Sequence, residues 1–68
     1  MKELVEKAAE KNWFFNLQYV DIKRRGGWQW IAAFARREEV MTHNYSAYDK
    51  DMQIAFDEAY KQIEEHLK

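Results

Sequence analysis

The chain has 68 residues, with 11 basic and 12 acidic side chains and a formal net charge of −1 at pH 7. It contains no cysteine, no proline and only two glycines, yet 16% of its residues are aromatic. Without cysteine it can form no disulfide, thiolate zinc site, iron–sulfur cluster or thiol nucleophile, and the nearly balanced charge favours no class of partner.

A short helix is predicted over residues 2–12. Its apolar residues, Leu4, Val5, Ala8 and Ala9, recur at helical spacing, while lysines and glutamates occupy most other positions. This apolar stripe is narrow, so the helix has to pack against the rest of the chain in order to persist.

Three strands are predicted to follow. Hydrophobicity alternates with a period of two from residue 13, which indicates a first strand of about ten residues. Gly26 and Gly27 then lie between two aromatic-rich segments, and this pair predicts a tight hairpin turn because glycine accepts a positive φ at both turn positions. Residues 29–37 are predicted to form the second strand and residues 40–47 the third.

The predicted hairpins determine which side chains share a face of the sheet. They pair Tyr19 with Phe34 and Phe34 with Met41. One face then carries Trp13, Phe15, Leu17, Tyr19, Trp28, Trp30, Phe34, Met41 and Tyr45. We expect both helices to cover this face, so that its aromatic side chains form the core and are not free to stack on a ligand. Phe14 is the exception, because it lies on the opposite face.

A second helix is predicted from about residue 48 to Leu67. Its N-terminus is expected to be capped by Ser46 or Asp49. Its apolar stripe consists of Met52, Ala55, Phe56, Ala59, Ile63, His66 and Leu67. The expected fold class is therefore α+β, with the order α-β-β-β-α and a three-stranded antiparallel meander that has both helices packed on its aromatic face.

The chain is expected to be a single compact domain, residues 1–68, since domains typically run to ~100–150 residues and this chain is too short for two. No apolar run approaches the ~20 residues of a membrane span, and the N-terminal segment is too charged for a signal peptide. We therefore expect a cytoplasmic protein that does not associate with a membrane.

Basic residues gather at both predicted turns. Lys23, Arg24 and Arg25 lie at the first turn, and Arg36 and Arg37 lie at the second. Together with the α-β-β-β-α order, they give the chain a topology that is similar to the double-stranded-RNA-binding domain. The resemblance implies an RNA-binding function in which these cations contact phosphates.

Two features of the sequence disfavour this RNA-binding alternative. The family has lysines at the start of its second helix, where this chain has Asp49 and Asp51, and carboxylates repel a phosphate backbone. A strand of nine or ten residues also separates the two basic clusters by roughly 30 Å. Glu38 and Glu39 partly neutralise the second cluster.

The preferred interpretation is a protein-binding surface on the second helix. Four carboxylates are expected to project outward from it: Asp57, Glu58, Glu64 and Glu65. Lys61 is spaced to pair with the acidic residues four positions before and after it. Ile54 falls outside the buried stripe, so it is expected to be an exposed apolar residue beside these acids. Such a surface suits a basic partner.

The uncovered face of the sheet is a second candidate for a protein interface. Val20, Ile31 and Ala33 contribute to a modest apolar band on this face, surrounded by Asn, Gln and Thr. A flat face of small residues suits a partner or a second copy of the chain. An edge strand is a further route to a homodimer.

No catalytic, cofactor or metal site is predicted. His43 and Asp21 share a face, but Ala32 lies between them, and strands about 4.8 Å apart leave the pair too distant for a direct bond. No pair of histidines or carboxylates recurs at ligand spacing on one inward face. The expected function is a small non-enzymatic protein-binding module. Accessory proteins of phages and other mobile elements, including inhibitors, are similar to it in size and composition.

Overall fold

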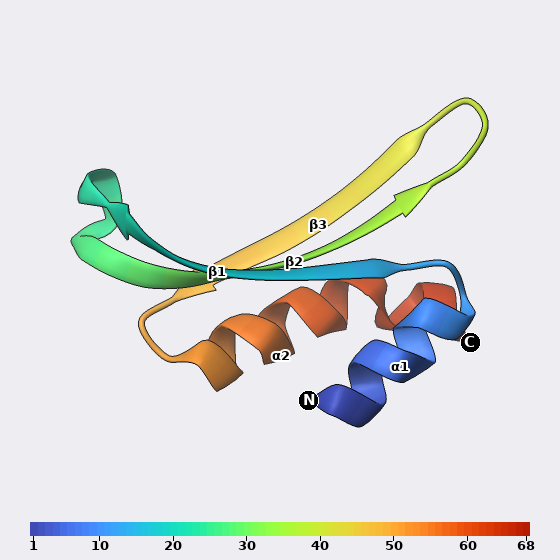
Figure 1. The fold of residues 1–68 in the computed structure, drawn as a ribbon, viewed down its shortest axis with the longest axis horizontal. Coiled ribbons are helices and arrows are strands. Elements are labelled where there is room, and N and C mark those ends of the chain that lie inside the picture. The colour runs from blue at the N-terminus through green and yellow to red at the C-terminus, as the bar shows by residue number, and fades with distance from the viewer.

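The computed structural model describes residues 1–68 and confirms the predicted α+β fold (Figure 1). Its elements are α1 (Lys2–Glu10), β1 (Phe14–Ile22), β2 (Gly27–Arg37), β3 (Thr42–Asp49) and α2 (Met52–Ile63), with short 3-10 helices η1 (Lys23–Arg25) and η2 (Glu64–Leu67). The strands form an antiparallel sheet in the order β1-β2-β3. Both helices lie on one side of this sheet, where α2 packs on β2 and β3 and α1 packs on β1.

The first helix ends where Asn12 adopts a left-handed conformation, with φ of 67°. Asparagine tolerates this region better than most residues, so it is suited to terminate a helix. The Asn12 N–H donates to the Ala9 carbonyl and the Trp13 N–H donates to the Ala8 carbonyl, each at 3.0 Å. Ala8 is fully buried, whereas Ala9, which belongs to the predicted stripe, is exposed.

The second helix begins later than predicted. Strand β3 continues to Asp49, and Asp51 is the N-cap in place of Ser46 or Asp49. Asp51 Oδ1 accepts hydrogen bonds from the backbone N–H groups of Gln53 and Ile54 at 2.8 and 3.1 Å, which satisfies two donors that have no partner within the helix.

Both hairpin turns are longer than predicted. The first connection, residues 23–26, consists of η1 followed by Gly26, whose φ of 89° lies in the left-handed region. Gly27 already belongs to β2. The second connection runs from Glu38 to Met41 and is closed by the N–H of the first donating to the carbonyl of the last at 2.8 Å. Each hairpin is thus joined by four residues, where the sequence analysis expected two.

The predicted register is wrong for this reason. Tyr19 lies opposite Trp30 and not Phe34, and Phe34 lies opposite Tyr45 and not Met41. A four-residue connection shifts the two strands along each other. It still pairs odd-numbered with even-numbered residues, as a two-residue connection does. No strand residue therefore changes face, because side chains alternate with a period of two. The aromatic face is the one that the alternation predicts.

The core lies between this face and the two helices. Its largest fully buried side chains are Trp13, Phe34, Phe56 and Ile63. The ring of Phe34 packs edge-on against those of Phe56 and Tyr60, with centroids 5.7 and 5.9 Å apart. Such edge-to-face contacts stabilise a core beyond the burial of their area. Two residues of the predicted helical stripe, Met52 and His66, are exposed, and Tyr60 is buried in the core instead.

The helices do not cover the whole aromatic face. A helix of 12 residues such as α2 is about 18 Å long, whereas a strand of 11 residues such as β2 spans roughly 36 Å. Both hairpins consequently extend beyond the helices (Figure 1). The expectation that this face is wholly core is therefore wrong at both hairpins. At the first, Tyr19 is 51% exposed and Trp28 is 57% exposed, and at the second, Met41 is 60% exposed in the turn.

Candidate functional site

The outward side of α2 carries an open hollow of about 410 Å³. It is lined by Ile54, Asp57, Glu58, Tyr60, Lys61 and Glu64. These residues recur every three or four positions, so they form one continuous strip along the helix. Ile54 is 48% exposed, as the sequence analysis expects, and Tyr60 supplies the other apolar side chain.

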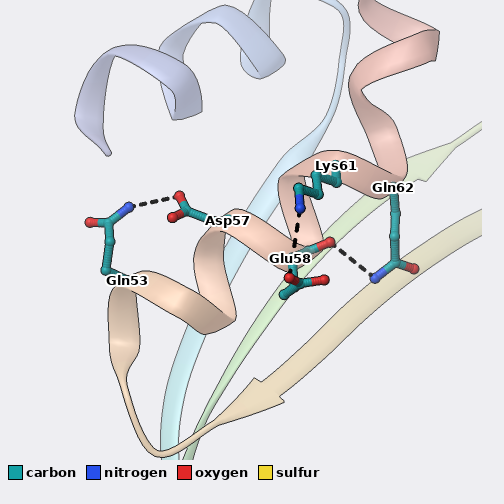
Figure 2. A network of polar contacts seen from close by, with 5 residues as sticks. All are labelled: Gln53, Asp57, Glu58, Lys61 and Gln62. Atoms are coloured by element: carbon teal, nitrogen blue, oxygen red, sulfur yellow. Dashed lines mark hydrogen bonds and ion pairs between the residues drawn. The ribbon is translucent and has the colours of Figure 1, made fainter.

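Hydrogen bonds and one ion pair order part of this strip (Figure 2). Gln53 Nε2 donates to Asp57 Oδ1 at 2.9 Å, one turn away. Lys61 Nζ lies 3.8 Å from Glu58 Oε1, so it pairs with Glu58 and with neither of the acids four positions away. Both partners of this pair are largely exposed, so it contributes at most about 1 kcal/mol to stability.

Gln62 holds the same helix against the sheet. Its Nε2 donates to the carbonyl of Ser46 on β3 at 2.9 Å. It also donates, more weakly, to the carbonyl of Glu58 at 3.4 Å (Figure 2). The strip of acidic residues is therefore built on an element that is anchored by a cross-element hydrogen bond as well as by its buried side chains.

Tyr60 connects the hollow to the core. Burial raises the pKa of its phenol above the usual value of 10.0, and the nearby Glu64 carboxylate raises this pKa further. Both effects disfavour the phenolate, because a buried charge loses hydration and a neighbouring carboxylate repels it. The phenol is thus an uncharged part of the hollow's lining, like Ile54.

The raised pKa predicts a loss of stability in alkaline solution. The unfolded chain ionises Tyr60 near pH 10 while the folded chain still holds it neutral, so the free energy of unfolding falls as the pH rises above ~10. We expect this fall to be smaller in Tyr60→Phe, which has no phenol, and intermediate in Glu64→Gln. Urea denaturation of the three proteins at neutral and at alkaline pH measures it. An identical alkaline loss in wild type and Tyr60→Phe would contradict the prediction.

The predicted partner-binding residues fall on two separate surfaces. Ile54, Asp57, Glu58 and Glu64 lie together around the hollow, whereas Glu65 is exposed but does not line it. The remaining residues, Val20, Ile31 and Ala33, are half-buried on the face of the sheet that no helix covers.

The uncovered sheet face is less plain than predicted. Tyr48 of β3 lies opposite Ile31, and the guanidinium carbon of Arg25 is 4.5 Å from the centroid of the Tyr48 ring. Gln29 is buried on the same face, where its Nε2 donates to the Arg25 carbonyl. This cation–π contact and hydrogen bond attach the first turn to the sheet.

The two basic clusters lie at opposite ends of β2, as the sequence analysis expects (Figure 1). Lys23, Arg24 and Arg25 form η1, and none of them has a carboxylate within 4.0 Å. At the other end, Arg36 Nε lies 3.4 Å from Glu38 Oε1. The other basic residue of that cluster, Arg37, pairs across the sheet with Thr42.

His43 and Asp21 do not form a catalytic pair. The expectation that Ala32 lies between them is wrong, because Asp21 lies opposite Trp28 and His43 lies opposite Arg36. Eight residues of β2 separate these positions by roughly 26 Å. His43 Nε2 instead lies 3.8 Å from Glu38 Oε2.

The structure contains neither a metal-binding cluster nor a membrane-spanning helix. No three side chains among the histidines, aspartates and glutamates are placed to hold a metal ion. No helix has the length and apolar composition required to cross a membrane.

Sequence reasoning missed two parts of the candidate surfaces. Tyr60 was expected on no surface, although its position four residues after Phe56 and three before Ile63 places it beside the buried stripe. The exposure of Tyr19 and Trp28 does not follow from alternation, because it depends on how far the helices extend along the strands.

Comparison with protein-family models, with curated proteins and with solved structures found no match to this chain.

Proposed function

We propose that the chain is a small non-enzymatic protein-binding module that docks a basic segment of a partner on the outward side of α2. The observation that carries this proposal is the hollow in which exposed Ile54 stands beside three carboxylates, those of Asp57, Glu58 and Glu64. An apolar centre with a polar rim is the usual arrangement of a protein–protein interface.

The chemistry of the hollow favours a lysine or arginine side chain. The aliphatic stem of such a side chain packs on Ile54 and the Tyr60 ring, while its cation lies among the carboxylates. Lys61 neutralises only Glu58, so the strip retains negative charge that attracts a basic partner.

The uncovered sheet face is the second surface in this proposal. Val20, Ile31 and Ala33 are half-buried there, and both β1 and β3 are edge strands. They suit a second contact with the partner, or a homodimer. An accessory or inhibitory role of phage type, exercised in the cytoplasm, fits a chain of this size and composition.

Charge reversal of the strip tests the proposal. The variant Asp57→Lys/Glu58→Lys/Glu64→Lys is compared with a control in which Glu3, Glu6 and Glu10 of α1, all exposed, are changed to lysine. Both variants change the net charge by the same amount, so only the position of the change differs. We expect pull-down of the partner by wild type and control, and an affinity at least about ten-fold weaker for the α2 variant.

Circular dichroism of each variant shows whether its fold is retained. The affinities are then measured by calorimetry with the purified partner. Equal loss in both variants would assign the effect to net charge alone, and unchanged binding by a folded α2 variant would contradict the proposal.

Duplex RNA binding through Lys23, Arg24, Arg25, Arg36 and Arg37 is the alternative function. It receives less support, because the two basic clusters lie at opposite ends of β2 and Glu38 is paired with Arg36. The absence of a gel shift with duplex RNA at low salt would exclude it.

A further inference from the structure

Three aromatic side chains form an uncovered shelf at the first hairpin. We call Tyr19, Trp28 and Trp30 the aromatic shelf. The Tyr19 ring stacks on that of Trp28 with centroids 5.3 Å apart and an angle of 28° between their planes, and it lies 4.8 Å from the Trp30 ring. All three lie on the side of the sheet that the helices cover elsewhere.

The shelf is not part of the core. Trp30 is half-buried and packs against the core, so it forms the inner end of the shelf. Tyr19 and Trp28 are both more than half exposed. An aromatic side chain can bury about 150–250 Å², so leaving two of them in water forgoes a large stabilisation in so small a chain. The exposed parts of the two rings form an apolar patch of the kind that marks binding sites.

Basic residues adjoin the shelf. Strand β1 leads from Tyr19 into η1, in which Lys23, Arg24 and Arg25 are consecutive and exposed. Asp21, opposite Trp28, is the only carboxylate among residues 21–25, so this segment carries a net positive charge.

The nearest acidic residues on the other side of the shelf are engaged in backbone hydrogen bonds. Asp49, opposite Trp30, accepts from the Asp51 N–H at 2.8 Å. Asp51 itself caps α2. These bonds direct both carboxylates toward the start of α2, where the positive end of the helix dipole offsets part of their charge.

We propose that the aromatic shelf binds single-stranded nucleic acid, with bases stacked on Tyr19 and Trp28 and phosphates held by Lys23 and Arg24. Aromatic platforms beside cationic side chains bind single strands because every base has a π-face and every nucleotide carries a phosphate. A duplex keeps its bases stacked inside the helix and does not offer them to such a platform. This inference goes beyond the proposed function and concerns a different surface.

Two other occupants are opposed by charge. A second copy of the chain would bring a second basic η1 segment to the same surface, which raises the positive charge there. A basic peptide would meet Lys23 and Arg24, the two cations of η1 that are not engaged on the uncovered face of the sheet as Arg25 is. The net charge of this segment therefore favours a polyanion that also presents flat rings.

Fluorescence anisotropy with labelled oligo(U) and oligo(dT) of about 12 nucleotides tests the proposal at about 50 mM salt. We expect Trp28→Ala and Tyr19→Ala to weaken binding by about 5- to 100-fold each, the loss of one stacked base. Phe14→Ala is the matched control: Phe14 is 69% exposed on the opposite face, and its removal should leave affinity unchanged. Comparison of the two oligonucleotides shows whether the 2′-hydroxyl contributes.

The phosphate contacts have their own test. Lys23→Gln and Arg24→Gln should each reduce the slope of log affinity against log salt by about 0.7, whereas Arg37→Gln at the far end of β2 should not. Asp21→Asn should tighten binding, because it removes a charge that repels phosphate. Weaker oligonucleotide binding by Asp21→Asn would contradict the proposed contact of phosphate with this segment.

Several outcomes would overturn the proposal. They are the absence of binding to either oligonucleotide, an equal loss in Phe14→Ala and Trp28→Ala, or tighter binding of duplex than of single-stranded RNA. Light scattering adds one more: a wild-type dimer that becomes a monomer in Trp28→Ala would assign the shelf to self-association.

Discussion

Replacing Phe34 by alanine is expected to lower the free energy of unfolding by about 3–5 kcal/mol. The side chain is fully buried in the central strand, and its ring contacts those of Phe15, Phe56 and Tyr60. The substitution removes the transfer free energy of the ring and leaves a cavity between sheet and helix that the rigid strands cannot fill. Chains of this length have total stabilities of roughly 3–10 kcal/mol. The Phe34→Ala protein should therefore be largely unfolded or close to it.

Urea denaturation followed by far-ultraviolet circular dichroism measures the effect. Phe14→Ala is the control, since it removes the same ring from an exposed position of the neighbouring strand, and we expect it to change stability by no more than about 0.5 kcal/mol. Similar losses in the two variants would show that Phe34 does not occupy the core position described above.

Replacing Trp13 by alanine is expected to cost a similar ~3–5 kcal/mol, for a different structural reason. Trp13 directly precedes β1 and is almost fully buried, with its ring 5.8 Å from that of Tyr45 on β3 and 5.4 Å from that of His66 in η2. It thereby joins the beginning of the sheet to its far edge strand and to the C-terminal segment. Removing the Trp13 side chain should therefore weaken the packing of the start of β1, of β3 and of η2.

Trp13→Phe should be much milder. The indole N–H of Trp13 is buried without a hydrogen-bond acceptor in the protein, and an unsatisfied buried donor costs about 1–3 kcal/mol. Phenylalanine removes that donor, which offsets part of the lost packing. Urea denaturation of Trp13→Ala and Trp13→Phe side by side checks this order of stability. If Trp13→Phe lowered the free energy of unfolding more than Trp13→Ala does, the indole N–H would have to contribute favourably in the folded state.

The acidic surface of α2 was predictable because it depends on helical periodicity alone. Once residues 55, 56, 59 and 63 are placed inward, Ile54, Asp57 and Glu58 must point outward. The hollow itself was not predictable. It requires Tyr60 at its base, and whether a tyrosine at the margin of an apolar stripe is buried depends on what packs above it. In this fold the Phe34 and Phe56 rings hold it there.

The aromatic shelf shows the opposite case. Alternation along the strands correctly places Tyr19 and Trp28 on the same face as Phe34, but it cannot show how far a helix extends over that face. The predicted second helix also included residues 48–51, which belong to β3 and the turn before α2. A helix that begins later covers less of the sheet, and the hairpin beyond it remains exposed.

By itself, the sequence determined the order of the elements and the face on which each strand residue lies. Both follow from local periodicity, and a period of two is unchanged when a turn is lengthened from two residues to four. Only the tertiary structure decided the register, the N-cap at Asp51 and the part of the aromatic face that stays uncovered. These depend on where the chain reverses and on how helix and strand lengths compare. The eleven aromatic residues, most of which the sequence analysis assigned to the core, are in fact divided between a core and an exposed surface.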